Sequence, residues 1–229
     1  MKVVIYRNRY DKDIKKISRF VNGLQQKVND TVDIEVINDI SKDRTFQALC
    51  KGDILIIFSH GEDDKILYRL SERSSLQDYN NNVLIDYSNI GMLANKKAIV
   101  FACYTAKNLG DYAVRTAGLN TYIGFEDSID YTISDSRVEF GIISNFFYIA
   151  YSEVFEELIV TAINRNLTPK KIQEFFSEKM TKRIIEYNPD TLNEQYKLDG
   201  RHLLKIVNVL SKTLKGFRAK GNIDEGLVS

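Results

Sequence analysis

Five short apolar runs, separated by longer segments of helical spacing, restrict the fold of this chain more than any other feature. The runs occupy residues 2–6, 33–37, 53–58, 97–102 and 121–125. Residues 53–58 (DILIIF) are almost continuously apolar, which is typical of a strand covered on both faces. The segment 11–28 has apolar residues at every third or fourth position, which predicts an amphipathic helix. This alternation predicts an α/β fold, with a mostly parallel sheet flanked by helices.

From about residue 136 the pattern changes to helices alone. Segments 138–164, 169–187 and 201–217 have helical periodicity, and Thr168-Pro169 is a typical helix start. We expect one domain of 229 residues, with an α/β core at 1–135 and a mainly helical extension at 136–220 packing on it. The residues from 221 onward are expected to fray. Shorter elements complete the prediction: helices at 41–50, 87–94 and 106–117, and a hairpin of 66–70 with 83–85.

Charge and cysteine content exclude several classes of protein. The net charge is +1, so no global field attracts nucleic acid or a membrane. Two cysteines do not make a disulfide framework, and no CxxC or HxxxH pair is present to begin a zinc site. The N-terminal apolar run is too short for a signal peptide, and no run reaches the roughly 18 apolar residues of a membrane span. We therefore expect a cytoplasmic protein without a membrane association, a metal or another cofactor.

Two of the predicted strands end in reactive side chains. The run at 53–58 leads into Ser59-His60-Gly61, and the run at 97–102 leads into Cys103. If these strands are parallel neighbours, His60 and Cys103 emerge at the same edge of the sheet, where sites of such folds lie. An imidazole beside a thiol acts as its base and then protonates the leaving amine. A helix predicted to begin at Ala106 would favour the thiolate, and the N–H groups of Gly61 and Cys103 would hold an oxyanion.

Taken separately, each of these residues has a simpler interpretation. An isolated cysteine at a strand end is usually part of the core, and His-Gly after a strand is often only a turn. Their joint placement at matching strand ends favours chemistry. Cys50 precedes a strand, and His202 lies in a C-terminal helix, so both are interpreted as structural.

The order of these segments resembles the caspase-like cysteine peptidases. DILIIFSHGEDD at 53–64 is similar to the histidine segment of that family, and KKAIVFACYTAKNLG at 96–110 is similar to its nucleophile segment. GLNTYIGFEDSIDYTIS at 118–134 resembles the strand and acidic loop of the CHAT and separase branch, with a departure after Gly124. The resemblance implies a caspase-like three-layer sandwich and a cysteine endopeptidase that cleaves a protein substrate. It also implies a role in bacterial defence or cell death, and control by a partner protein or by self-processing within 71–82.

The resemblance places a substrate-reading acid at Asp130, in a loop that also contains Glu126 and Asp127. Carboxylates there would pair with Arg or Lys at P1, the residue before the cleaved bond. The other interpretation is a solvated acidic loop. No arginine stands near the end of either catalytic strand, apart from Arg115 within the following helix, so we do not expect cleavage after Asp. Three further acids, Glu62-Asp63-Asp64, would allow calcium binding as in some metacaspases, although adjacent acids more often face solvent.

Two alternatives remain open. The alternation of strands and helices also fits a catalytically inactive, flavodoxin-like binding or signalling module, although no glycine-rich phosphate loop follows the first strand. Residues 201–220 form a basic amphipathic segment without Asp or Glu. Such a helix would dock a regulatory protein, an acidic surface or RNA, or it would pack on the core with a solvated basic face.

Overall fold

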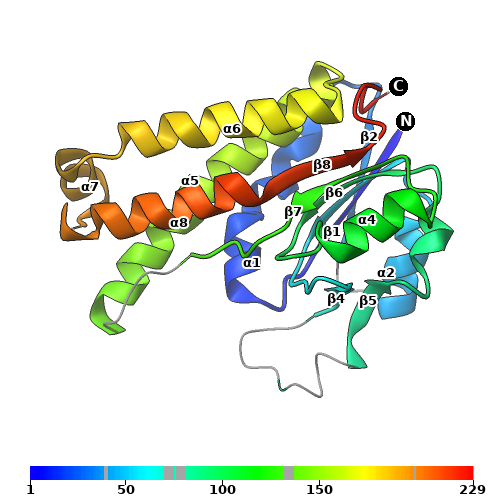
Figure 1. The fold of residues 1–229 in the computed structure, drawn as a ribbon, viewed down its shortest axis with the longest axis horizontal. Helices are drawn as coiled ribbons and strands as arrows, with labels where there is room; N and C mark the ends of the chain where they lie inside the picture. Colours follow the sequence, from blue (N-terminus) through cyan, green and yellow to red (C-terminus); the bar gives the residue numbers. More distant parts are fainter. Residues whose placement is uncertain (39–40, 70–74, 76–80, 132–136, 199, 229) are drawn as a thin grey trace.

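A six-stranded sheet forms the centre of the molecule, with strand order β2–β1–β3–β6–β7–β8 (Figure 1). The computed structural model describes residues 1–38, 41–69, 75, 81–131, 137–198 and 200–228. Five strands are parallel, and β8 is antiparallel to β7. The sheet is therefore mostly parallel, as the sequence predicts. The strands are β1 (Lys2–Arg7), β2 (Asp33–Ile37), β3 (Ile54–Phe58), β6 (Lys97–Phe101), β7 (Thr121–Phe125) and β8 (Phe217–Gly221).

Helices cover both faces of this sheet and make three layers. Alternate residues of each strand enter two separate cores, since successive side chains of a strand point to opposite faces. One core joins the sheet to α1 (Lys12–Ile17), α5 (Arg137–Asn164), α6 (Pro169–Glu186) and α8 (Leu203–Gly216). The other joins it to α2 (Lys42–Leu49) and α4 (Asn108–Arg115). The remaining helices of the described residues are α7 (Pro189–Tyr196) and the 3₁₀ segments η1 (Arg19–Lys27), η2 (Ile90–Leu93) and η3 (Gly200–His202).

Aromatic side chains form the centre of the first core. Phe155 of α5 lies between the sheet and α6, with its ring centroid 4.4 Å from that of Phe101 and 6.3 Å from that of Phe176. Phe58 of β3 stacks on Phe101 of β6 with centroids 4.5 Å apart. These rings are buried, so they hold the carboxyl ends of β3 and β6 rigidly against α5.

A small antiparallel pair, β4 (Lys65–Leu67) and β5 (Val83–Asp86), follows β3. The pairing confirms the predicted hairpin. Most of the segment 71–82 between these strands, where self-processing is predicted, lies outside the described residues. Gly61 forms an isolated bridge with Ile66, so the turn after His60 is attached to this hairpin.

Several sequence predictions are wrong in detail. The residues from 221 onward do not fray, because Leu227 is buried and its N–H donates to the carbonyl of Leu167. The helix predicted over 87–94 is only the 3₁₀ segment η2. The helix predicted over 11–28 divides at Ser18 into α1 and the 3₁₀ helix η1, because the Ser18 hydroxyl donates to the carbonyl of Ile14. The helix predicted from Ala106 begins at Asn108. The predicted helix over 201–217 ends at Gly216, and the chain continues as β8, which pairs with β7 from Phe217 to Gly221. The C-terminal part thus contributes a strand to the central sheet.

Among the described residues, no helix combines the length and the apolar composition that crossing a membrane requires.

Candidate active site

His60 and Cys103 lie together at the carboxyl edge of the sheet. Phe58 pairs with Phe101 across β3 and β6, and each reactive residue follows two positions later. Both line one small cavity of about 40 Å³, on the face of the sheet that α1 and α5 cover. This volume holds only a few water molecules. Its other lining is mainly apolar: Ile14, Ile17, Phe58, Ser59, Phe101, Ala102, Ile129, Tyr131 and Phe155.

Asp11 is a third residue of this site, and the sequence did not predict it. Its Oδ2 lies 3.2 Å from Nε2 of His60. Asp11 follows β1, the neighbour of β3, and it caps α1 by accepting hydrogen bonds from the N–H groups of Asp13 and Ile14. The cap holds the carboxylate in place, and the side chain is almost fully buried.

The charge of Asp11 is maintained despite its burial. Burial alone would raise the pKa of this carboxyl group. The contact with His60 and the N–H groups of Ile14 and Asp13 outweigh burial and lower the pKa below its usual value. Asp11 is therefore an anion at neutral pH.

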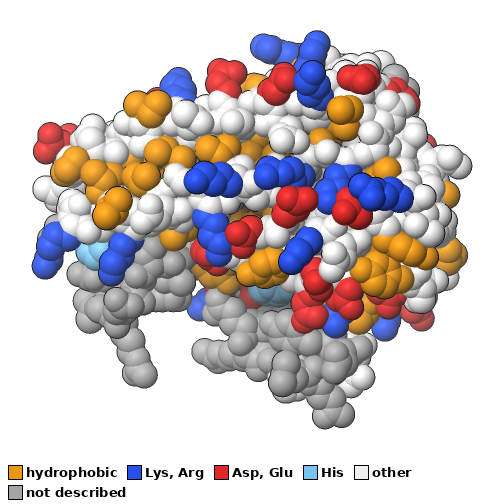
Figure 2. All heavy atoms as spheres, viewed as in Figure 1, with side chains coloured by type: hydrophobic (Ala, Val, Ile, Leu, Met, Phe, Trp, Pro, Cys, Tyr) orange, Lys and Arg blue, Asp and Glu red, His pale blue; other side chains and the backbone are white. Residues whose placement is uncertain are grey.

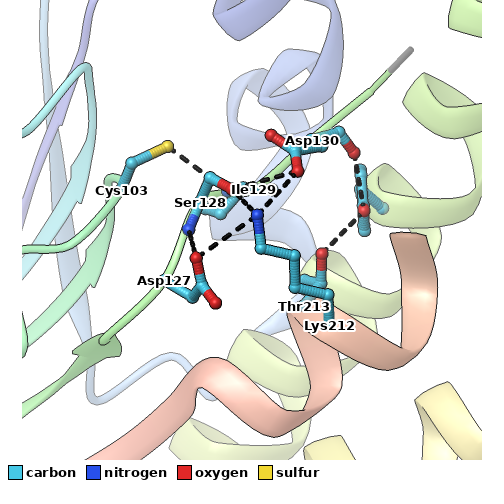
Figure 3. A network of polar contacts seen from close by, with 8 residues as sticks. Cys103, Asp127, Ser128, Ile129, Asp130, Lys212 and Thr213 are labelled. Atoms are coloured by element: carbon cyan, nitrogen blue, oxygen red, sulfur yellow. Dashed lines mark hydrogen bonds and ion pairs between the residues drawn. The ribbon is translucent and has the colours of Figure 1, made fainter. Parts of the chain in front are cut away.

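The environment of Cys103 differs from the predicted one. Its pKa is raised, first by burial and also by the charge of Asp130, while the N–H of Ile129 opposes the shift by donating to Sγ at 3.3 Å (Figure 3). The expected stabilisation of a thiolate by a helix N-terminus is wrong, because α4 begins only at Asn108. The thiol is consequently protonated at neutral pH.

The alkylation rate of Cys103 should therefore depend on pH in the alkaline range. A thiol with a pKa above the ordinary 8.5 is at most about 3% thiolate at pH 7. We expect the rate of iodoacetamide labelling at Cys103, followed by peptide mass spectrometry, to keep rising above pH 8.5. A rate that is already constant between pH 6 and 8 would show a resting thiolate–imidazolium pair and contradict this description.

Gly61 fits where no larger residue would. A Cβ atom at this position would lie 2.3 Å from Cγ2 of Thr105 and 2.8 Å from the carbonyl oxygen of Cys103. Within the described residues, neither the Gly61 nor the Cys103 N–H donates to an acceptor of another residue. Both N–H groups are thus available to a substrate oxygen beside the thiol.

The loop after β7 carries the three predicted substrate-reading acids, and each is already paired. Lys212 of α8 lies 3.1 Å from Asp130 and 3.4 Å from Asp127. Glu126 lies 3.3 Å from Arg218 and 3.0 Å from Lys220, both in β8. Figure 2 shows this mixture of Lys, Arg, Asp and Glu side chains along the band that α8 and β8 form in Figure 1. The basic face of 201–220 is thus partly neutralised by the acidic loop.

The other polar residues near this edge have structural partners. Glu62 pairs with Lys65 at 2.8 Å, and Asp63 accepts from the side chain of Asn108. Asp64 lies 3.9 Å from Lys65. Among the described residues, no group of three His, Cys, Asp or Glu side chains is arranged to hold a metal ion.

An arginine does stand near the catalytic strands, contrary to the sequence analysis. Arg7 ends β1 and pairs with Phe58 of β3. Its guanidinium is buried and donates to the side chain of Asn22 and the carbonyl of Lys15.

The second cysteine and the second histidine lie apart from the cavity. Cys50 caps α2 and precedes β3, at the end of the strand opposite to the cavity. His202 precedes α8.

No protein-family model matches the chain, and no curated protein matches it in sequence.

Proposed function

We propose that this protein is a cysteine endopeptidase of caspase-like architecture, with Cys103 as nucleophile, His60 as general base and Asp11 as the orienting carboxylate. One observation carries the proposal. The ends of two adjacent parallel strands bring His60 and Cys103 to one cavity, and an ionised Asp11 lies 3.2 Å from Nε2 of the imidazole. A base, its orienter and a nucleophile in this order are the parts that acyl transfer requires.

The chemistry follows from these positions. The imidazole of His60 takes the proton of Cys103 as Sγ attacks the carbonyl carbon of the peptide bond. The carbonyl oxygen becomes an oxyanion, which the N–H groups of Gly61 and Cys103 stabilise. The intermediate collapses, the C–N bond breaks, and His60 returns its proton to the leaving amine. Water, deprotonated by His60, then hydrolyses the thioester to release the acid and regenerate the thiol.

The substrate in this proposal is a protein with Arg or Lys at P1. Asp127 and Asp130 lie in the same loop as Ile129, and the N–H of Ile129 donates to Sγ of Cys103. A cation bound by these carboxylates would therefore lie near the nucleophile. Control by a partner protein or by self-cleavage remains part of the proposal, since an active peptidase in a cell has to be restrained.

A peptide library tests the proposal. We expect cleavage after Arg or Lys by the wild-type protein, and no cleavage by Cys103→Ala. Preference for a small apolar P1 residue would instead assign the P1 side chain to the apolar cavity beside His60. Absence of any Cys103-dependent cleavage would contradict the peptidase.

A binding or signalling module is the second candidate. The five parallel strands follow the order 2-1-3-4-5 when numbered along the chain, which is also the order of flavodoxin-like sheets. The sheet alone therefore does not separate the two candidates. The peptidase and the binding module differ in the reactivity that each predicts for Cys103.

A further inference from the structure

The side chain of Lys212 lies between the two carboxylates nearest to the nucleophile. Its Nζ lies 3.1 Å from Asp130, 3.4 Å from Asp127 and 2.6 Å from the hydroxyl of Ser128 (Figure 3). These three residues flank Ile129, whose N–H donates to Sγ of Cys103. A cation of the protein itself thus occupies the position that the proposed function gives to a basic P1 side chain.

The loop does not depend on Lys212 for its position. The carbonyl of Asp130 accepts a hydrogen bond from the buried hydroxyl of Tyr151, which also contacts Thr213. Earlier in the loop, the carbonyl of Asp127 accepts a hydrogen bond from the N–H of Tyr104. The N–H of Glu126 donates to the carbonyl of Gly216. Backbone and buried contacts therefore hold the loop, and the lysine is an additional, exchangeable partner.

The ion pairs of Lys212 are also weak enough to exchange. The side chains of Lys212, Asp127 and Asp130 are each about 40% exposed, at 42%, 42% and 41%. Exposed pairs contribute little because water and salt screen them and long side chains lose entropy. An open groove of about 430 Å³, lined by Asp127, Ser211, Lys212 and Lys215 among others, gives an incoming side chain access to this position.

We propose that Lys212 is a specificity-determining residue of the site: it fills the Asp127–Asp130 acid pair in the free protein, and a basic P1 side chain has to displace it. The inference rests on the proposed function. Arginine would displace the lysine more readily than a substrate lysine would, because its planar guanidinium bonds two carboxylate oxygens at once. Peptides with an apolar P1 residue do not compete with Lys212.

Kinetics of Lys212→Met test this inference on three matched peptides that differ only in P1: Arg, Lys and Ala. We expect kcat/KM for the Arg and Lys peptides to rise about 2- to 30-fold through a lower KM, the range that two exposed ion pairs span. The Ala peptide should be unaffected. Lys212→Arg, which keeps a cation, and Lys182→Met, which removes the same charge from an exposed position on α6 outside the groove, should show no such gain.

Three results would overturn the inference. A uniform fall of kcat on all three peptides, with an unchanged urea midpoint, would make Lys212 a support of the loop. An equal gain in Lys182→Met would show that the effect comes from the general charge of the protein. Cys103-dependent cleavage of the Ala peptide without any gain for the basic peptides in Lys212→Met would refute the inference and leave the peptidase intact. The proposed function itself fails on a different result, namely that the wild-type protein cleaves none of the library.

Discussion

Replacing His60 with alanine should lower kcat/KM for peptide hydrolysis by about 10²–10⁴-fold, the contribution of a positioned general base. The reason lies in the raised pKa of Cys103, which burial causes first. Without an imidazole to take the proton, few molecules contain a thiolate at neutral pH. The measurement is steady-state hydrolysis of the best library peptide, with circular dichroism to establish that the variant is folded. An activity within twofold of wild type would contradict the role of His60.

Asp11→Asn is the matched companion of this variant. Asparagine keeps a side-chain oxygen that can cap α1, so the free energy of unfolding should stay within about 1 kcal/mol of wild type. The negative charge beside His60 is lost, and we expect kcat/KM to fall at least about 10-fold, within the range for an impaired general base. Wild-type kinetics in Asp11→Asn would restrict Asp11 to helix capping.

Gly61→Ala should impair both stability and catalysis. The added methyl group would overlap with the carbonyl oxygen of Cys103, at 2.8 Å, and with Thr105. The backbone beside the nucleophile therefore has to move. We expect a loss of about 1–3 kcal/mol in urea unfolding, typical of overpacking. Because the shift displaces an oxyanion donor, kcat should fall by about 10²–10³-fold.

Gly91→Ala is the control for this substitution. Gly91 lies in η2, and a Cβ atom there would have no neighbour within 4 Å. Its stability and kinetics should match those of the wild-type protein. Equal activity in Gly61→Ala and Gly91→Ala would show that the turn after β3 has no part in catalysis.

The four inner strands of the sheet were predictable because they are apolar and buried on both faces, as in Ile54–Phe58. The edge strand β8 was not, since its sequence FRAKG alternates Arg and Lys with Phe, Ala and Gly and continues the basic pattern of α8. Its pairing with β7 depends on contacts nearly 100 residues away in the chain. A local pattern does not encode such a contact.

The site shows the same division between local and distant information. His60 and Cys103 were recognisable because both follow apolar strands. Asp11 was missed because its role depends on the adjacency of β1 and β3, although an acid four residues after the first strand is a signal that could have found it. The direction of the Cys103 pKa was predicted wrongly, since burial is a property of the packed structure. Lys212 contacts Asp130 across 82 positions, which no motif indicates.

One measurement tests the peptidase most directly: labelling with a peptidyl acyloxymethyl ketone that has Arg at P1, mapped by mass spectrometry. Cys50 is an internal control, because it is half-buried and burial raises its pKa as well. We expect rapid modification of Cys103 alone, and its loss in His60→Ala. Slow and equal modification of Cys50 and Cys103, unaffected by His60→Ala, would contradict the peptidase and favour a binding module.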